Sequence, residues 1–426
     1  MDTARPPGPR GHWLLGNVVA YDKDRISFLR RHHREYGDVF SFDDRVVFTI
    51  DPQLTHQVLT ATNHDYVTEL TPFAGSSALH AAGEMINPWM RARRVVRPVL
   101  GDAAVSGLDR RIVAILDAVL DRTAGRDVDV LPVMLDFAGH AVAELCLGED
   151  AAGIPELLLA GHAALLPFED AGYQVPAWVP LPRNRRFVRV HRRTVETLTR
   201  LVSARRAEPV GRPHRDLLDV LLSAHPAMTD KSVTTTLWSI LVGGHGIPAA
   251  ALTSIVRELA MRPRLAADLA DEAGPLAGVE PYARLPLAEA VVKETLRLSP
   301  PAWMMTRVAC TAVTLGGWRL RPGDEVLCTP YLIHRDPRWW SQPDEFDPAR
   351  WETARPAPGT YLPFGSGSRY CLGAAVAMRQ LTLATSRIAQ RFHVHAPNAV
   401  AAEPEFCGRL APAGLRAEFR SVPVER

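Results

Sequence analysis

The chain has 426 residues, of which 47% are hydrophobic and 23% are charged, and its formal net charge is +2. This composition is ordinary for a folded protein with a large core, and the small net charge does not favour nucleic acid or an anionic membrane surface as a partner. The length alone would allow about three domains, but no Ser/Gly tract, acidic run or internal repeat marks a linker.

The cysteines indicate the compartment. There are five of them, none stands in a Cys-x-x-Cys pair and no signal peptide precedes them. This pattern is typical of reduced thiols in a cytoplasmic protein. The first ten residues are polar and rich in proline, so we expect no membrane anchor there.

The N-terminal part of the chain predicts a small mixed region. Residues 26–36 have the apolar spacing of a helix, residues 39–42 and 46–50 predict two paired strands, and residues 52–60 predict a short helix.

A basic helical stretch follows at residues 89–100, with Trp89 and Arg93 one turn apart on the same face. An indole N–H and a guanidinium placed together suit a carboxylate. Further arginines step round the same helix and form either a solvated face or a docking patch for an acidic electron-transfer protein. These residues are Arg91, Arg94 and Arg97.

The middle of the chain is mostly helical and leads into an uncharged stretch, Ser232–Val256. This stretch is long enough to span a bilayer, but its threonines, glycines and proline make it a poor membrane span. We expect a long helix buried on all sides. Pro248 has no N–H for the Gly244 carbonyl, so we expect a kink there and a carbonyl that is free to hold water.

The next segment combines a helix with several strands. Glu294 and Arg297 lie three residues apart on a helix and can pair along one face. Met304 and Met305 follow on a predicted strand, either as adaptable lining of a substrate pocket or as ordinary core.

A hairpin is predicted beyond these methionines. Residues 318–321 and 325–329 have the composition of strands, and Pro322-Gly323-Asp324 between them predicts the turn.

The most informative stretch is Pro363–Gly373, whose glycines allow a tight backbone curl. Leu372–Arg391 predicts a helix, so Cys371 stands where a loop enters a helix. Free N–H groups and the helix dipole favour a thiolate there, and N–H groups of the curl can bond to the sulfur. A metal-bearing ligand could bind at this sulfur. Arg369 could pair with an anionic group of that ligand, and Gly373, which has no side chain, would leave room for a flat ligand.

Five residues of this stretch match the pattern Phe-x-x-Gly-x-Arg-x-Cys-x-Gly, and the chain therefore resembles the cytochrome P450 family. They are Phe364, Gly367, Arg369, Cys371 and Gly373. The resemblance runs from about residue 6 to the end of the chain. It implies a mainly α fold with a small β region, as one domain over residues 1–426 whose β-rich part is mainly 1–70 and 302–330.

The resemblance also implies the cofactor and its contacts. It implies haem b, with the Cys371 thiolate as the iron ligand and Phe364, Gly365, Arg369 and Gly373 around it. The residues implied as partners of the haem propionates are Trp89, Arg93 and Arg307. A buried structural cluster is implied for Glu294, Arg297 and Arg350, and it would lock the segment that leads to the cysteine loop. Apolar substrate lining is implied for Ile247, Met304 and Met305.

One motif departs from the family. Its central helix usually reads Ala/Gly-Gly-x-acid-Thr, and the acid and the alcohol relay protons to dioxygen at the haem. Here the matching stretch is Gly243-Gly244-His245-Gly246-Ile247-Pro248. Gly246 and Ile247 replace the acid and the alcohol, and neither side chain can transfer a proton. We expect Gly244 to approach the haem plane, Gly246, Ile247 and Pro248 to complete this atypical catalytic stretch, and His245 to pack.

The expected function is monooxygenation of an apolar small molecule, hydroxylation or epoxidation in secondary metabolism. Dioxygen would be the oxidant, and a separate ferredoxin with its ferredoxin reductase would supply two electrons. We expect a cytoplasmic monomer that binds no nucleic acid.

Three alternatives stay open at this point. The missing acid–alcohol pair also fits a peroxide-driven peroxygenase, or a haem-thiolate enzyme of coupling, nitration or rearrangement. From another class, the chain could be a non-catalytic haem sensor or binding protein.

Overall fold

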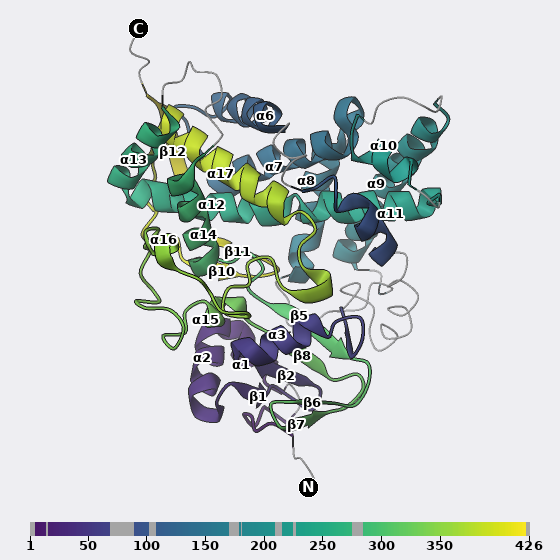
Figure 1. Ribbon diagram of the computed structural model, residues 1–426, viewed down its shortest axis with the longest axis vertical. Helices are drawn as coiled ribbons and strands as arrows, with labels where there is room; N and C mark the ends of the chain where they lie inside the picture. The colour runs from purple at the N-terminus through teal and green to yellow at the C-terminus, as the bar shows by residue number, and fades with distance from the viewer. Residues whose placement is uncertain are drawn as a thin grey trace.

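The computed structural model describes residues 5–13, 16–68, 89–101, 108–169, 179, 181–208, 215–224, 227–274 and 284–422. Helices make up most of the molecule, and a small β region lies at one end (Figure 1). The predicted mainly α fold with a small β region is confirmed.

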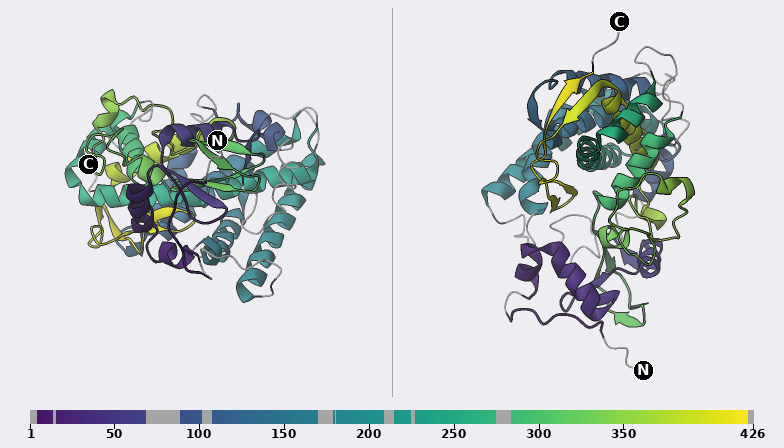
Figure 2. Two further views of the ribbon diagram at one scale, coloured as in Figure 1. Left: turned by 90° about the horizontal axis from the view of Figure 1, so that it is seen from below. Right: turned by 90° about the vertical axis from the view of Figure 1, so that its left-hand side faces the viewer.

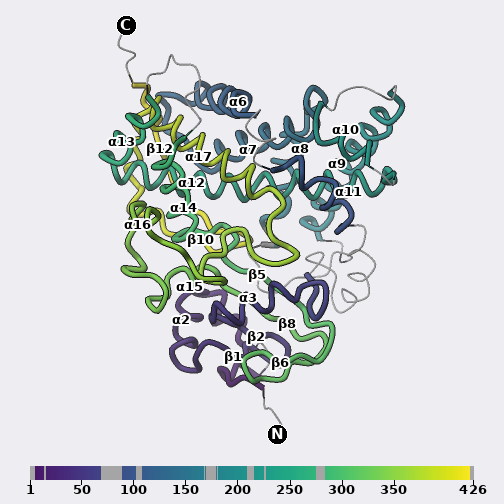
Figure 3. Tube along the Cα trace, viewed as in Figure 1, coloured from purple at the N-terminus to yellow at the C-terminus, as the bar shows by residue number. Residues whose placement is uncertain are grey.

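The β region is built from two segments far apart in the sequence, residues 39–67 and 305–328, which lie side by side there (Figure 3). Its five-stranded sheet has the order β1-β2-β8-β5-β3, in which only β2 and β8 run parallel. The strands are β1 (Val39–Ser41), β2 (Val46–Thr49), β3 (Tyr66–Val67), β5 (Met305–Ala309) and β8 (Glu325–Cys328). The predicted pairing of the first two strands is confirmed, with Phe40 opposite Phe48.

The predicted hairpin between residues 318–321 and 325–329 is wrong. β7 (Trp318–Leu320) pairs with β6 (Val313–Leu315), and the turn between them is Gly316-Gly317, both with positive φ. Two adjacent glycines suit a two-residue hairpin turn. β8 instead lies between β2 and β5 as a central strand, because its Val326 and Cys328 are fully buried.

Short polar side chains set several helix starts. Asp24 accepts a hydrogen bond from the Ser27 N–H at 2.9 Å and caps α2 (Arg25–Tyr36). Asp51 caps α3 (Pro52–Thr60) in the same way, and Pro52 takes the first helical position, where its missing N–H leaves no bond unmade.

The helical part surrounds one pair of helices, α11 (Asp230–Gly243) and α12 (Gly246–Met261), and Figure 2 (right) looks along them. The surrounding helices are α6 (Asp109–Asp121), α7 (Val130–Leu147), α8 (Ile154–Glu169), α9 (Pro182–Arg206), α10 (Leu217–Leu222), α13 (Pro263–Ala273), α14 (Pro286–Leu298) and α17 (Ala374–Arg391). The largest apolar cluster joins α6, α7, α12, α14 and α17, with Phe137, Leu252 and Leu383 among its buried members.

Smaller elements complete the chain. The short helices are α1 (Val18–Lys23), α15 (Pro330–Ile333), α16 (Arg350–Thr353), η3 (Gly148–Ala151) and η4 (Gly367–Arg369). The remaining strands are β4 (Asp127–Asp129), β9 (Phe392–His395), β10 (Pro404–Phe406), β11 (Leu410–Pro412) and β12 (Arg416–Ser421). They form a sheet β4-β12-β9 and a pair β10-β11.

The uncharged central stretch differs from the single helix that we expected. The helix breaks at Gly244 and His245, so Pro248 becomes the third residue of α12. The N–H groups of a first helical turn have no partner within the helix, and proline is therefore tolerated there. The stretch is also not buried on all sides, since Val242 and Ile247 are exposed.

Among the described residues, two helical stretches are long and apolar enough to cross a membrane, 130–151 and 230–261. Their most apolar windows are 67% and 61% buried inside the protein. Buried core helices of soluble proteins can be equally long and apolar, and both stretches contribute residues to the largest apolar cluster.

Candidate active site

The cysteine loop is shaped by two glycines and anchored to α3. Gly365 and Gly367 both have φ of +70°, and a side chain on Gly367 would collide with the Leu59 carbonyl at the end of α3. The Cys371 N–H donates to the Phe364 carbonyl at 2.9 Å, which closes the curl. The helix after it begins at Ala374, two residues later than expected, so Cys371 stands just before the first turn.

Opposing influences act on the Cys371 sulfur. Burial raises the pKa of the thiol, while the Gly373 N–H, which donates a hydrogen bond to the sulfur, and the positive charge of Arg93 lower it. The N–H donor that we expected is therefore present. A bound metal ion would supply a further positive charge that favours the thiolate.

Three arginines lie at this loop, one of them within it, and each hydrogen-bonds a neutral partner. Arg93 donates to the Tyr370 carbonyl at 2.6 Å. Arg307 of β5 donates to the Thr62 hydroxyl at 2.9 Å, and Arg369 donates to the Asn63 side-chain carbonyl at 3.1 Å.

These three guanidinium groups lie close enough to repel one another. Burial, together with the charges of Arg93 and Arg307, lowers the pKa of Arg369 to about 10. Among the described residues, no carboxylate lies within ion-pair distance of any of the three. A thiol beside three uncompensated cations fits a ligand that brings both a metal and two carboxylates, as haem does. Trp89 lies half-buried at the start of the same helical segment as Arg93, residues 89–96.

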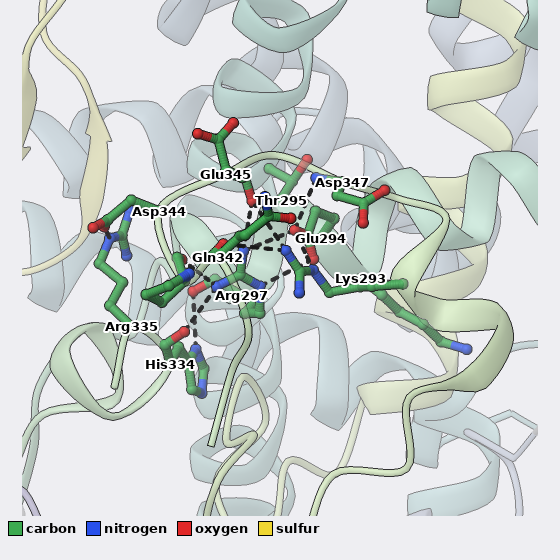
Figure 4. Close-up of polar contacts among 12 residues, drawn as sticks. Lys293, Glu294, Thr295, Arg297, His334, Arg335, Gln342, Asp344, Glu345 and Asp347 are labelled. Carbon is green, nitrogen blue, oxygen red and sulfur yellow. Dashed lines mark hydrogen bonds and ion pairs between the residues drawn. The ribbon is translucent and has the colours of Figure 1, made fainter. Parts of the chain in front are cut away.

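A buried ion cluster holds the segment before the loop in place (Figure 4). Glu294 binds Arg297 at 2.8 Å and Arg350 at 2.9 Å, and all three side chains are almost fully buried. Arg297 and Arg350 lower the pKa of Glu294 against the effect of burial. Trp351, which sequence reasoning did not single out, adds an indole N–H to Glu294 at 2.9 Å.

His334 connects this cluster to the cysteine loop. The Arg297 guanidinium donates to the His334 carbonyl at 2.9 Å, and the His334 ring accepts from the Leu362 N–H at 2.7 Å. Leu362 directly precedes the loop. Sequence reasoning had no signal for this contact, which joins residues 28 positions apart.

The two glycines of the central stretch have different surroundings. A β-carbon on Gly244 would lie 2.5 Å from Val142 Cγ2, so this glycine lets α11 pack against α7. Gly243 has open space beside it, with no atom within 4 Å of a β-carbon. The expected approach of Gly244 to the haem plane stays a prediction.

Ile247 and Gly246 line a cavity of about 230 Å³ between α8, α9 and the α11–α12 break. Pro248 is buried behind them, and His245 is 3% exposed, as expected of a packing residue. Met304 and Met305 do not line this cavity. Met305 is half-buried near the cysteine loop, with its sulfur 3.6 Å from a β-carbon on Gly365.

A mainly helical fold with a cysteine at this loop-to-helix junction, between basic groups that suit two carboxylates, defines a haem-thiolate protein. Comparisons with known proteins agree. A model of the cytochrome P450 family matches residues 6–415. The chain belongs to the cytochrome P450 family, and it is a monooxygenase that binds haem iron through a thiolate.

Curated relatives are known from bacteria. Cyclooctatin synthase of Streptomyces melanosporofaciens is 30% identical over 92% of this chain and 93% of its own length. Cyclooctat-9-en-7-ol 5-monooxygenase of the same organism is 32% identical over 89% of this chain and 87% of its own. Among solved structures, retinoic acid-bound cyanobacterial CYP120A1 has a TM-score of 0.84 at 21% identity, and the match covers 99% of this chain and 100% of that one.

Proposed function

We propose that this single-domain enzyme holds haem b through the Cys371 thiolate and inserts an oxygen atom of dioxygen into an apolar small molecule, by hydroxylation or epoxidation. The observation that carries the proposal is the environment of the Cys371 sulfur, which accepts a hydrogen bond from the Gly373 N–H and interacts with the positive charge of Arg93. When bound, the haem supplies the activation of dioxygen. The printed names of the two Streptomyces relatives support a role in secondary metabolism.

The residues around the haem would divide the work. Arg93, Arg307 and Arg369, with Trp89, would bind its propionates, since their guanidinium groups have neutral partners only. Phe364, Gly365 and Gly373 would shape the loop that holds the sulfur, and the Gly373 N–H would reduce the electron density that the sulfur donates. The Glu294–Arg297–Arg350 cluster would keep that loop in position without touching the haem.

Members of the family take electrons from redox partners and bind small substrates. We propose a separate ferredoxin and ferredoxin reductase for this cytoplasmic, monomeric chain. A cleft of about 1160 Å³ runs between residues 89–101 and α17 and reaches Cys371. The exposed arginines of that helical segment, two of which line the cleft, would attract an acidic partner. They are Arg91, Arg94 and Arg97.

Peroxide is the second candidate oxidant, because a reaction that starts from peroxide needs fewer protons than one that starts from dioxygen. The observation that favours it is the pair Gly246 and Ile247, which cannot relay protons. Coupling, nitration or rearrangement chemistry would fit the same departure.

The test compares product formation on a broad substrate panel under two regimes. One uses NADPH, ferredoxin and reductase, and the other uses hydrogen peroxide alone. We expect the electron chain to support turnover that peroxide does not exceed. A rate with peroxide that the electron chain cannot match would identify a peroxygenase, and absence of turnover under both regimes would favour a haem sensor.

A further inference from the structure

The cavity beside Ile247 is apolar except for a few nitrogen-bearing side chains. It lies between α8, α9, the α11–α12 break and the turn that joins β10 to β11. Its apolar lining includes Leu158, Leu165, Phe187, Val190, Trp238 and Val242. The polar lining side chains are those of His162, His191, His245 and Arg409, and no aspartate or glutamate belongs to the described lining.

Arg409 fixes the proton position on His162. The Arg409 Nη2 lies 2.6 Å from the His162 Nε2. A guanidinium can only donate, so Nε2 must accept, and the ring proton of neutral His162 must be on Nδ1. Burial and the charge of Arg409 lower the pKa of His162 to about 3, so the ring is neutral at ordinary pH.

The His162 Nδ1–H is therefore an available donor, since it makes no hydrogen bond with the part of the chain that the structure describes. It faces the surface of Gly246. A β-carbon on Gly246 would lie 3.7 Å from His162 Nδ1 and 3.9 Å from Arg409 Nη1. Gly246 has no side chain, so the space in front of the His162 Nδ1–H stays open.

Two other histidines line the cavity. His245 hydrogen-bonds the Leu135 carbonyl, and its Nε2 is buried. The His191 ring stacks on Phe187, and its Nδ1 is buried as well. The donor that lies next to the open space beside Gly246 is the His162 Nδ1–H.

We propose that the His162 Nδ1–H, whose position Arg409 fixes, binds one oxygen atom of the substrate in the space beside Gly246. The substrate class is an apolar molecule with an oxygen acceptor, either an alcohol or a carboxylate. The proposal rests on the proposed function, since it places the substrate of that reaction, and it makes His162 a specificity-determining residue.

Three probes with one compact hydrocarbon skeleton test the proposal: adamantane, 1-adamantanol and 1-adamantanecarboxylate. Their dissociation constants are measured on the haem-loaded enzyme by calorimetry and by the shift of the Soret band. We expect the alcohol or the carboxylate to bind about 3- to 10-fold more tightly than adamantane, the gain of one buried hydrogen bond. The tighter of the two identifies the class of oxygen.

Two variants connect that preference to the site. In His162→Leu the preference for the oxygen-bearing probe should vanish, and adamantane should bind as before. His162→Asn can keep an N–H donor near the position of Nδ1 and should retain part of the preference. Gly246→Ala, whose new methyl group makes only ordinary contacts, should fold normally and exclude the oxygen.

Equal binding of all three probes by the parent enzyme would overturn the proposal, as would a preference that persists in both His162→Leu and Gly246→Ala. Failure of every probe to bind an enzyme with a normal thiolate spectrum would also overturn it. The proposed function fails separately, if the haem-loaded protein lacks that spectrum, and calorimetry still measures the probe preference in that case.

Discussion

Gly244 shows how one hydrogen atom can decide the packing of two helices. A β-carbon there would lie 2.5 Å from Val142 Cγ2, although its φ of −85° suits any residue. We predict that Gly244→Ala lowers the free energy of unfolding by about 1–3 kcal/mol through overpacking.

The partner and a control make this prediction specific. Val142→Ala in the same chain should recover part of the loss, so that the double variant loses less than the two single variants together. Gly161→Ala on α8, which has no atom within 4 Å of the new methyl group, should not destabilise the protein. Denaturant unfolding measures the four variants and their parent, and equal stability of Gly244→Ala and the parent would contradict this role of the glycine.

Ile247 occupies the position where relatives carry the alcohol. If dioxygen is the oxidant, Ile247→Thr should lower uncoupling, because a hydroxyl exposed in the cavity can pass a proton that the isoleucine cannot. The measurement is the hydrogen peroxide released for each NADPH consumed with the ferredoxin chain. Unchanged or greater uncoupling would mean that protons arrive by another route, such as water at the Gly244 carbonyl.

Among single residues, the sequence identified those that belong to a short motif with fixed spacing. The five matched positions around Cys371 needed only the loop itself. The contact between His162 and Arg409 joins residues 247 positions apart, and no local pattern connects them. The role of Gly244 was also beyond reach, because the atom that requires glycine belongs to another helix.

Among the elements, α14 carries two ion pairs that differ in burial. Glu294 is fully buried against Arg297 and Arg350, whereas Glu289 and Lys293 form an exposed pair one turn earlier. Glu294→Gln should lower the free energy of unfolding by about 3–5 kcal/mol, because two buried guanidinium groups lose their counter-charge.

Glu289→Gln is the matched control on the same helix. Exposed pairs contribute little, so its loss should stay below about 1 kcal/mol. Chemical unfolding of the two variants decides the point. If the two variants lost similar free energies of unfolding, the buried cluster would not stabilise the segment before the cysteine loop more than an exposed ion pair does.

Element types were easier to predict than their pairing. The strands of residues 39–42 and 46–50 came from alternation, and their pairing followed from a short connection. The strand at 325–328 was assigned to a neighbouring hairpin, but it lies inside a sheet between β5 and β2, and β2 is far away in sequence. A kink was expected from the bond that Pro248 cannot make to the Gly244 carbonyl, but the start of a second helix at Gly246, with Pro248 in its first turn, was not.

For the whole molecule, His334 couples stability to pH. It is fully buried, and burial lowers the pKa of its ring to about 3. The unfolded chain binds a proton at this histidine below about pH 6.5, whereas the folded chain does not until about pH 3. The contribution of His334 to the free energy of unfolding is therefore fully present above about pH 6.5. It falls as the pH drops towards about pH 3, by about 1.4 kcal/mol for each pH unit.

We predict that His334→Gln, which can still accept from the Leu362 N–H, has a shallower decline of stability between pH 6.5 and pH 5 than its parent. The difference in slope should approach the contribution of one histidine. Denaturant midpoints across this pH range measure it. Identical slopes would show that His334 does not carry this linkage.

The proposed enzyme activity depends on a bond between the Cys371 sulfur and iron, and the absorption spectrum of the reduced enzyme with carbon monoxide tests this bond most directly. We predict the long-wavelength band typical of thiolate ligation in the parent protein and its loss in Cys371→Ala. A parent protein without that band, or a Cys371→Ala variant that holds haem and gives the same spectrum, would contradict the assignment of the active site.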